Sequence, residues 1–247
     1  MLPLREQREL LITAIADLLD GVRHVAVGAS SPIPAAGAML LRARNEVSGK
    51  MPIRISILGS AQHNFFTNGT IEIFDCAAQG RIDAFFLGGG QIDGSGNINL
   101  VGTGRYPQSQ VRWPGSFGSA YLYHLVPRVI LFREEHSPRV LVPKVDFVSA
   151  AATTPEVPRR GGPHALLTNM ALFAFDRERA RFTLRSAHPG FSATDIRGNT
   201  GFDYDTADVV PATPAPDTAT LGLLRGRVLD ELGETYPTFA NSMVQAA

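Results

Sequence analysis

Short apolar runs alternate with amphipathic stretches along the first third of the chain. Three apolar or β-branched runs predict strands, at residues 24–27, 54–59 and 84–87. Three patterns with helical spacing predict helices, at residues 4–19, 35–44 and 71–79. Alternation of this kind is typical of βαβ units. We therefore expect an α/β fold with an open, mostly parallel sheet flanked by helices.

The middle of the chain loses the helical pattern and favours β-structure. Strand-like segments separated by Gly, Pro and Ser turns are expected at residues 97–100, 128–132, 139–148, 166–175 and 181–186, followed by a short helix at 192–197. Residues 209–220 contain three closely spaced prolines, which predicts a Pro-rich strap. Residues 221–234 are expected to form a C-terminal helix. Residues 1–247 are expected to fold as a single domain.

The charge balance and the cysteine content exclude several classes of protein. Lys and Arg number 23, as do Asp and Glu, so no net field is available to attract nucleic acid or an anionic membrane. Cys76 is the only cysteine, which excludes an internal disulfide and fits a reducing compartment. The N-terminal segment carries charges among its leucines, and no uncharged apolar run approaches the length of a membrane span. We expect a soluble, cytoplasmic protein that binds neither nucleic acid nor membrane.

Several standard catalytic motifs are absent from the chain. It contains no GxSxG elbow, no phosphate-binding P-loop, no HExxH and no complete GxGxxG. The six histidines lack metal-ligand spacing, so we expect no metal site.

Glycine-rich segments follow several of the predicted strands. They lie at residues 28–32, 57–60, 88–91 and 114–119. In open α/β sheets, ligands bind at the carboxyl ends of strands, where glycines let backbone N–H groups approach an anionic group. We therefore expect these loops to line one pocket. The simpler alternative is that each glycine only forms a tight turn.

The residues of several segments, and the order of these segments along the chain, resemble those of a known family. The similar segments are EIFD at residues 72–75, QGRID at 79–83, GGGQIDGSGNIN at 88–99, VRWPGSFGSA at 111–120, VPKVDF at 142–147, HPG at 188–190 and NTGF at 199–202. Together they resemble the β-subunits of class I CoA-transferases, in particular of glutaconate CoA-transferase. The resemblance extends from about Val25 to Arg227.

This resemblance implies a CoA-transferase subunit fold and a β-subunit that acts on acyl-CoA thioesters beside an α-type partner subunit. No cofactor would be bound permanently, because coenzyme A enters as part of the substrate. In the family, a β-subunit glutamate attacks the thioester and forms covalent intermediates. The matching turn here is Ser56-Ile57-Leu58-Gly59, so Ile57 occupies the position of that nucleophile.

Alternatives remain open for the missing carboxylate. Glu46 precedes the strand rather than following it, which favours a solvated loop residue. Some relatives without the β-subunit glutamate hydrolyse a C–C bond in a cyclic keto acyl-CoA, with the catalytic glutamate on the α-subunit. A non-catalytic acyl-CoA-binding subunit is a third possibility. A sugar-phosphate isomerase-like or ligand-binding domain of related fold is the alternative from a different class.

The candidate site residues follow from the glycine-rich loops and the resemblance together. The backbone N–H of Gly118 is the candidate oxyanion donor, because donors near a thioester carbonyl stabilise developing negative charge. The candidate substrate-binding residues are Gly28, Ser31, Gly89, Gly90, Gln91, Asn97, Gly115, Ser116 and Ser119. For Gln91 and Asn97, satisfying backbone groups of turns is an equally good interpretation.

Overall fold

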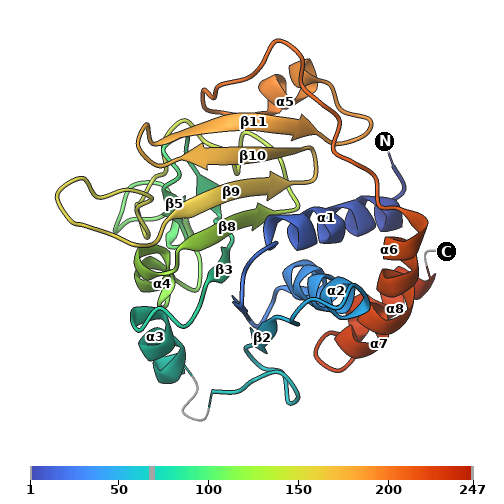
Figure 1. The fold of residues 1–247 in the computed structure, drawn as a ribbon. Coiled ribbons are helices and arrows are strands. Elements are labelled where there is room, and N and C mark those ends of the chain that lie inside the picture. Colours follow the sequence, from blue (N-terminus) through green and yellow to red (C-terminus); the bar gives the residue numbers. More distant parts are fainter. Residues whose placement is uncertain (1, 67–69, 246–247) are drawn as a thin grey trace. The chain divides into compact units, whose positions relative to one another are not determined.

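The structure is a computed structural model that describes residues 2–66 and 70–245 (Figure 1). Its contacts divide the chain into two compact units. Met1–Phe86 and Pro214–Ala247 form the first unit, and Leu87–Thr213 form the second. The expected single domain over residues 1–247 stays a prediction.

The first unit contains three short parallel strands. They are β1 (His24–Val27), β2 (Arg54–Ile57) and β3 (Ala84–Leu87). β1 pairs in parallel with both neighbours, so the order is β3-β1-β2. All four residues of β1 are buried, because an inner parallel strand is covered on both faces. The three strands predicted here from the sequence are confirmed.

Helices α1 (Leu4–Leu18), α2 (Pro32–Val47) and α3 (Thr70–Ala78) complete the N-terminal part of this unit. α1 packs closely on α2 (Figure 1). A Cβ atom on Gly37 would lie 2.3 Å from Ile15 Cγ2, so only glycine permits this approach.

The chain returns to the first unit through its C-terminal helices. These are α6 (Thr218–Leu223), a π-helical turn at Leu224–Val228, α7 (Leu229–Leu232) and α8 (Pro237–Gln245), and the first three pack against α2. The expected C-terminal helix at residues 221–234 is therefore present but broken: Gly226 has non-helical dihedral angles inside the π-helical turn. α8 was not predicted from the sequence.

The second unit is built on a four-stranded arrangement of mixed direction. It comprises β8 (Arg128–Arg133), β9 (Pro163–Thr168), β10 (Ala171–Asp176) and β11 (Arg181–Ala187) in the order β11-β10-β9-β8. β8 and β9 are parallel, whereas β10 is antiparallel to both of its neighbours. Among the longer strands of the two units, the parallel pairs β1–β2, β1–β3 and β8–β9 outnumber the antiparallel pairs β9–β10 and β10–β11. The α/β, mostly parallel fold class is confirmed.

Shorter elements surround these strands. β4 (Gln91–Ile92) pairs with β5 (Ile98–Asn99), and β6 (Gly102–Thr103) pairs with β7 (Val111–Arg112). The helices are α4 (Ser119–Leu125), which was not predicted, and α5 (Ala193–Asn199), which was. Ser192 caps α5 through a reciprocal capping box with Asp195. The Pro-rich segment 209–220 runs past the end of β11, where Ala187 and Ala212 form an isolated bridge, and residues from Thr218 onward are helical.

Two strand predictions are wrong. Residues 139–148 form no strand and contribute only one bridge, between Ile92 and Leu141. Residues 166–175, predicted as one strand, instead span the end of β9, a tight turn and most of β10. The hydroxyl of Thr168 accepts hydrogen bonds from the N–H groups of Met170 and Ala171 and so stabilises that turn.

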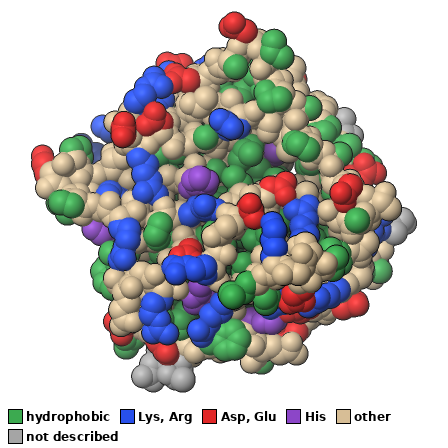
Figure 2. All heavy atoms as spheres, in the orientation of Figure 1, with side chains coloured by type: hydrophobic (Ala, Val, Ile, Leu, Met, Phe, Trp, Pro, Cys, Tyr) green, Lys and Arg blue, Asp and Glu red, His purple; other side chains and the backbone are tan. Residues whose placement is uncertain are grey.

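The surface view agrees with the balanced composition, since basic and acidic side chains are interspersed on the face shown in Figure 2. Within residues 2–66 and 70–245, every helix falls short of the length and apolarity needed to cross a bilayer.

Candidate functional site

The turn after β1 contains Gly28 and Ser31. Ser31 directly precedes α2, and its hydroxyl lies 3.5 Å from the position that a Cβ atom on Gly28 would take. The carbonyl of Gly28 accepts a hydrogen bond of 3.1 Å from the Tyr236 hydroxyl. The C-terminal segment therefore contacts the carboxyl end of β1.

The turn after β2 contains Ile57, the position of the missing nucleophile. Ile57 is fully buried, and its N–H donates to the carbonyl of His63 at 2.9 Å. The next residue, Leu58, donates its N–H to the carbonyl of Val27 at 3.0 Å, which ties this turn to the end of β1. Gly59 has a φ of +90°, a conformation that glycine adopts without strain. The turn is thus a packed structural element with an apolar side chain where the family resemblance implies the nucleophile.

A carboxylate does reach this turn, but from the far end of the sequence. Glu234 accepts hydrogen bonds from the Ser60 hydroxyl and the Ala61 N–H, both at 2.7 Å. Hydrogen bonds from the hydroxyl of Thr235, the Ser60 hydroxyl and backbone N–H groups lower the pKa of Glu234 to about 2, despite the opposing effect of burial. Through these hydrogen bonds Glu234 acts as a brace for the turn. The sequence offered no signal for it, since the contact spans more than 170 residues.

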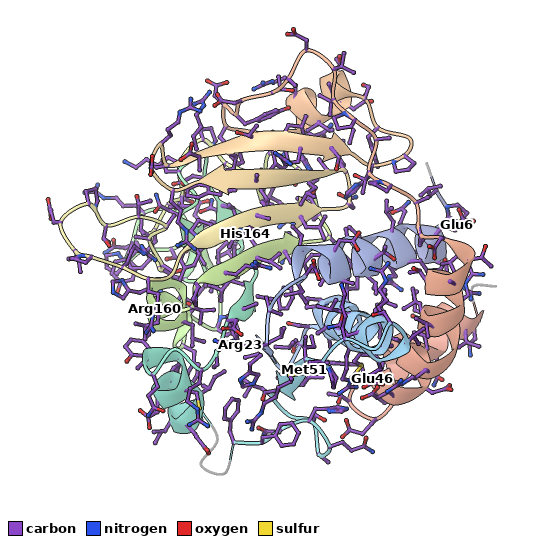
Figure 3. All side chains as sticks on the ribbon, in the orientation of Figure 1. Glu6, Arg23, Glu46, Met51, Arg160 and His164 are labelled. Carbon is purple, nitrogen blue, oxygen red and sulfur yellow. The ribbon has the colours of Figure 1, made fainter. Side chains whose placement is uncertain are left out.

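Glu46, the other carboxylate considered from the sequence, lies near the C-terminal end of α2 (Figure 3). It forms an ion pair of 2.6 Å with Arg227. Glu46 is therefore a structural residue, but the expected loop location is wrong, because it lies in a helix.

In the second unit, Gly89 and Gly90 permit close contacts. A Cβ atom on Gly90 would lie 2.3 Å from the indole ring of Trp113, and one on Gly89 would lie 2.6 Å from the carbonyl oxygen of Gln91. Trp113 leads directly into the loop that contains Gly115, Ser116 and Gly118. The start of the loop that leads to Gly118 is therefore in contact with Gly90, and the expected shared pocket stays a prediction.

The side chain of Gln91 belongs to a buried polar network. Its amide oxygen accepts from the side-chain amide of Asn99 at 2.7 Å and from the N–H of Asp146 at 3.0 Å. Its amide nitrogen donates to the Asp146 carboxylate at 3.1 Å. Asp146 also accepts from the N–H of Gly104. Gln91 thus fixes the loops on either side of it, which favours an indirect role in positioning.

Asn97 has a similar local role. Its side-chain amide nitrogen donates to Asp93 at 3.2 Å, and its side-chain oxygen accepts from the N–H of Ala152 at 3.2 Å. Asp93 in turn accepts from the N–H groups of Ser95 and Asn97. The turn between β4 and β5 is therefore held by its own side chains.

The loop from Trp113 to Ser119 differs from all of these segments. Gly115 has a φ of +111° and Phe117 a φ of +43°, so the backbone bends sharply before Gly118, which precedes the first residue of α4. A left-handed conformation is strained for a bulky residue such as Phe117, and such strain is concentrated at functional sites.

Two donors at this loop are unused. The hydroxyl of Ser119 is buried and makes no hydrogen bond with any residue of the described chain. The N–H of Gly118 likewise donates to none of the residues that the structure describes, whereas the N–H of Ser119 donates to the carbonyl of Ser116. A buried hydroxyl without a partner is unfavourable by about 1–3 kcal/mol. The loop thus holds two neighbouring donors that have no partner among the described residues.

Histidines and acids elsewhere do not add a metal centre. In the described residues, no group of three or more His, Cys, Asp or Glu side chains is arranged to hold a metal ion. His188 is buried, donates from Nε2 to the carbonyl of Thr168 and accepts at Nδ1 from the Thr213 hydroxyl. It stabilises the end of β11.

Comparison with known proteins gives matches over most of the chain. A family model described as coenzyme A transferase matches residues 9–199. The chain is 30% identical over 151 residues to one subunit of the glutaconate CoA-transferase of Acidaminococcus fermentans, a match that covers 58% of this chain and 56% of that relative. It is 27% identical over 236 residues to the cholesterol ring-cleaving hydrolase IpdB subunit of Rhodococcus jostii, a match that covers 90% and 91% of the two chains.

Among solved structures, Rhodococcus jostii IpdAB is similar with a TM-score of 0.77 at 25% identity, over 89% of this chain and 93% of that one. The chain spans 56% and 63% of the lengths of the two CoA-transferase subunits that it matches in sequence.

Proposed function

This chain belongs to the coenzyme A transferase family, and from that premise we propose that it is the β-type subunit of an enzyme that acts on acyl-CoA thioesters together with an α-type subunit. Coenzyme A enters and leaves as part of the substrate, so no cofactor stays bound. The lone buried thiol of Cys76 fits a protein of the reducing cytoplasm.

The unpartnered hydroxyl of Ser119 beside the N–H of Gly118 is the observation that carries this proposal. Each donor would form its hydrogen bond only when a thioester carbonyl is bound, and both would strengthen as the carbonyl oxygen gains charge. Gly115 and Ser116 shape the same loop. Gly89, Gly90 and Gln91 support it through Trp113 and the Gln91–Asn99–Asp146 network. Gly28 and Ser31 supply the second candidate binding turn, in the first unit.

Family resemblance favours CoA transfer to a carboxylate as the reaction. A second candidate, hydrolytic cleavage of a C–C bond in a cyclic keto acyl-CoA, is favoured by one specific observation. Ile57 leaves the end of β2 without a carboxylate of its own, and the oxygens of Glu234 are occupied by hydrogen bonds from Ser60 and Ala61. The nucleophile or base would then come from the α-subunit. The match to the ring-cleaving hydrolase subunit, which spans nine tenths of the chain, supports this candidate.

The test is to co-express the chain with a candidate α-subunit, incubate the complex with acyl-CoA, and trap acyl-enzyme or thioester intermediates with hydroxylamine or borohydride. Peptide mass spectrometry then locates the modified residue. A modified glutamate on this chain supports transfer with an unrecognised nucleophile. Free acid or a ring-opened product without such a modification supports hydrolysis. A complex that binds acyl-CoA without turnover indicates the non-catalytic alternative, and a complex that binds no CoA derivative contradicts the proposal.

A further inference from the structure

A cavity lies in the first unit, at the amino ends of β1 and β2. Its volume is about 350 Å³, which is within the range of small-molecule sites. His24 and Arg54, the first residues of β1 and β2, both line it. The candidate acyl-CoA residues Gly28 and Ile57 lie at the carboxyl ends of these same strands.

Three guanidinium groups line the cavity, and they differ in how they are paired. Arg23 is neutralised by Asp83, with two side-chain hydrogen bonds of 2.8 and 3.2 Å. Burial disfavours ionisation of Asp83, but the hydrogen bonds from Arg23 outweigh it and lower the pKa of that carboxyl. Arg81 makes one long contact, 3.4 Å, with Gln79.

Arg54 is the cation available to a ligand. Its guanidinium lies 5.0 Å from the centre of the Phe65 ring, a cation–π contact that restrains its orientation. It forms no side-chain hydrogen bond or ion pair with any residue of the described chain, so its donors face the cavity and solvent. Guanidinium donors are arranged to bind a carboxylate with two parallel hydrogen bonds.

The rest of the cavity wall sets the character of the ligand. Phe65, Phe66 and the buried thiol of Cys76 supply apolar surface. Glu72 and Asp83 offset two of the three guanidinium charges, so the lining has a formal net charge of +1. One positive charge beside an aromatic wall matches a ligand with one negative charge and an apolar body.

His24 is a buried, neutral residue of the cavity lining. Nδ1 lies 2.8 Å from the carbonyl of Arg81 and must donate to it, so Nε2, 2.9 Å from the Ser56 hydroxyl, accepts. Both ring nitrogens are therefore occupied, and Arg54 and Arg81 are left as the groups that meet a ligand anion.

We propose that this cavity is a binding site for a small monocarboxylate with an apolar or aromatic body, held by Arg54 and Arg81 against Phe65. The carboxylate binds the two guanidinium groups and the body of the ligand packs along the phenylalanine rings. The proposal does not depend on the acyl-CoA site.

The test uses benzoate as the probe and calorimetry on the full-length chain. Benzoate is expected to bind, whereas benzamide, which has the same shape without the charge, is expected to bind at least tenfold more weakly. Raising the salt concentration from 50 to 500 mM should weaken benzoate binding, because the cavity is open to solvent. Inorganic phosphate, which lacks the apolar body, should bind more weakly than benzoate.

Arg54→Met is expected to weaken benzoate binding at least tenfold, and Arg81→Met is the second variant. Arg8→Met is the matched control, because Arg8 makes the same type of contact, 4.9 Å from the centre of the Phe239 ring, outside the cavity. Equal binding of benzoate and benzamide, tighter binding of phosphate, or unchanged benzoate affinity in both Arg54→Met and Arg81→Met would overturn the proposal.

Discussion

The turn after β2 and the loop before α4 are both glycine-containing segments that the sequence placed in one candidate site, yet they are built differently. In the turn after β2, the donors of Ser60 and Ala61 are taken up by Glu234, and Ile57 is buried. In the loop before α4, Ser119 keeps a buried hydroxyl without a partner in the described chain. One segment is a satisfied structural turn and the other holds unused hydrogen-bonding capacity.

This difference supports the loop before α4 as the segment that meets a ligand. Buried polar groups are nearly always hydrogen-bonded in native proteins, so an exception requires a reason. A satisfied turn gains nothing from a substrate, whereas an unsatisfied donor is stabilised when a substrate carbonyl arrives. Under the proposed function, a thioester would therefore meet the loop before α4, and the turn after β2 would supply no nucleophile.

The largest expected effect comes from restoring a carboxylate in the satisfied turn. Ile57→Glu places a carboxyl group at a fully buried position that an apolar side chain now fills. Burial of an unpaired carboxyl group is expected to lower the free energy of unfolding by about 5 kcal/mol. Urea unfolding followed by circular dichroism measures this loss.

Ile57→Leu is the matched control, since it conserves volume and polarity and should lower the free energy of unfolding by less than about 1.5 kcal/mol. If Ile57→Glu were as stable as Ile57→Leu and gained CoA-transferase activity with an α-subunit, the turn would be a catalytic turn that merely lacks its acid.

The sequence predicted both the turn after β2 and the loop before α4 as glycine-rich loops. It gave no indication of which one would have its hydrogen-bond donors satisfied. β1 and β3 were predicted with their observed bounds, because short apolar runs ended by glycine specify such strands locally. The brace by Glu234 depends on a contact between residues 61 and 234, and no local pattern encodes it.

The errors have local physical causes as well. Residues 140–142 are buried and apolar, as a strand would be, but Pro143 has no N–H for a ladder and the segment bends there. The turn between β9 and β10 contains neither Gly nor Pro, and the Thr168 hydroxyl organises it instead. α4 was missed because Gly115, Ser116 and Gly118 gave its start the composition of a loop.

Acid offers a way to separate the two segments. Burial lowers the pKa of His136 and of His188, both in the second unit, to about 4. An unfolded histidine has a pKa of about 6.5, so these groups stabilise the fold fully above pH 6.5 and lose that contribution as pH falls towards 4. At pH 5 the loss is about 2 kcal/mol for each histidine.

Glu234, by contrast, stays ionised at pH 5, because its pKa is about 2. Trp113, the only tryptophan, lies at the start of the unsatisfied loop, so its fluorescence reports unfolding of the second unit. We expect a lower urea midpoint by Trp113 fluorescence at pH 5 than at pH 7, and a smaller pH dependence in His188→Gln. A midpoint that is equal at both pH values would show that these histidines are not held neutral.

The brace itself can be removed by Glu234→Gln. The glutamine keeps one oxygen acceptor but turns an NH₂ donor towards the donors of Ser60 or Ala61. The loss of a charge-assisted hydrogen bond is expected to lower the free energy of unfolding by about 1–2 kcal/mol. Glu178→Gln, at an exposed carboxylate in the turn between β10 and β11, is the control and should change little. If Glu234→Gln equalled this control while abolishing turnover, Glu234 would be a catalytic group and not a brace.

The smallest change in stability, and the most informative one, is expected from Ser119→Ala. Because the Ser119 hydroxyl has no partner in the described chain, its removal should raise the free energy of unfolding by about 1 kcal/mol. The same change removes a donor for the thioester oxygen, so acyl-CoA turnover by the complex with an α-subunit should fall about 100-fold in kcat.

Ser149→Ala is the opposite case, because that hydroxyl donates to the carbonyl of Ile98 at 2.9 Å and accepts from the N–H of Leu100 at 3.0 Å. It should lower stability by about 1 kcal/mol and leave kcat unchanged. Thermal melts measure the stability of both variants, and steady-state kinetics measure their kcat. If Ser119→Ala lost stability and kept its kcat, the Ser119 hydroxyl would be an ordinary structural group, and the contrast between the two segments would disappear.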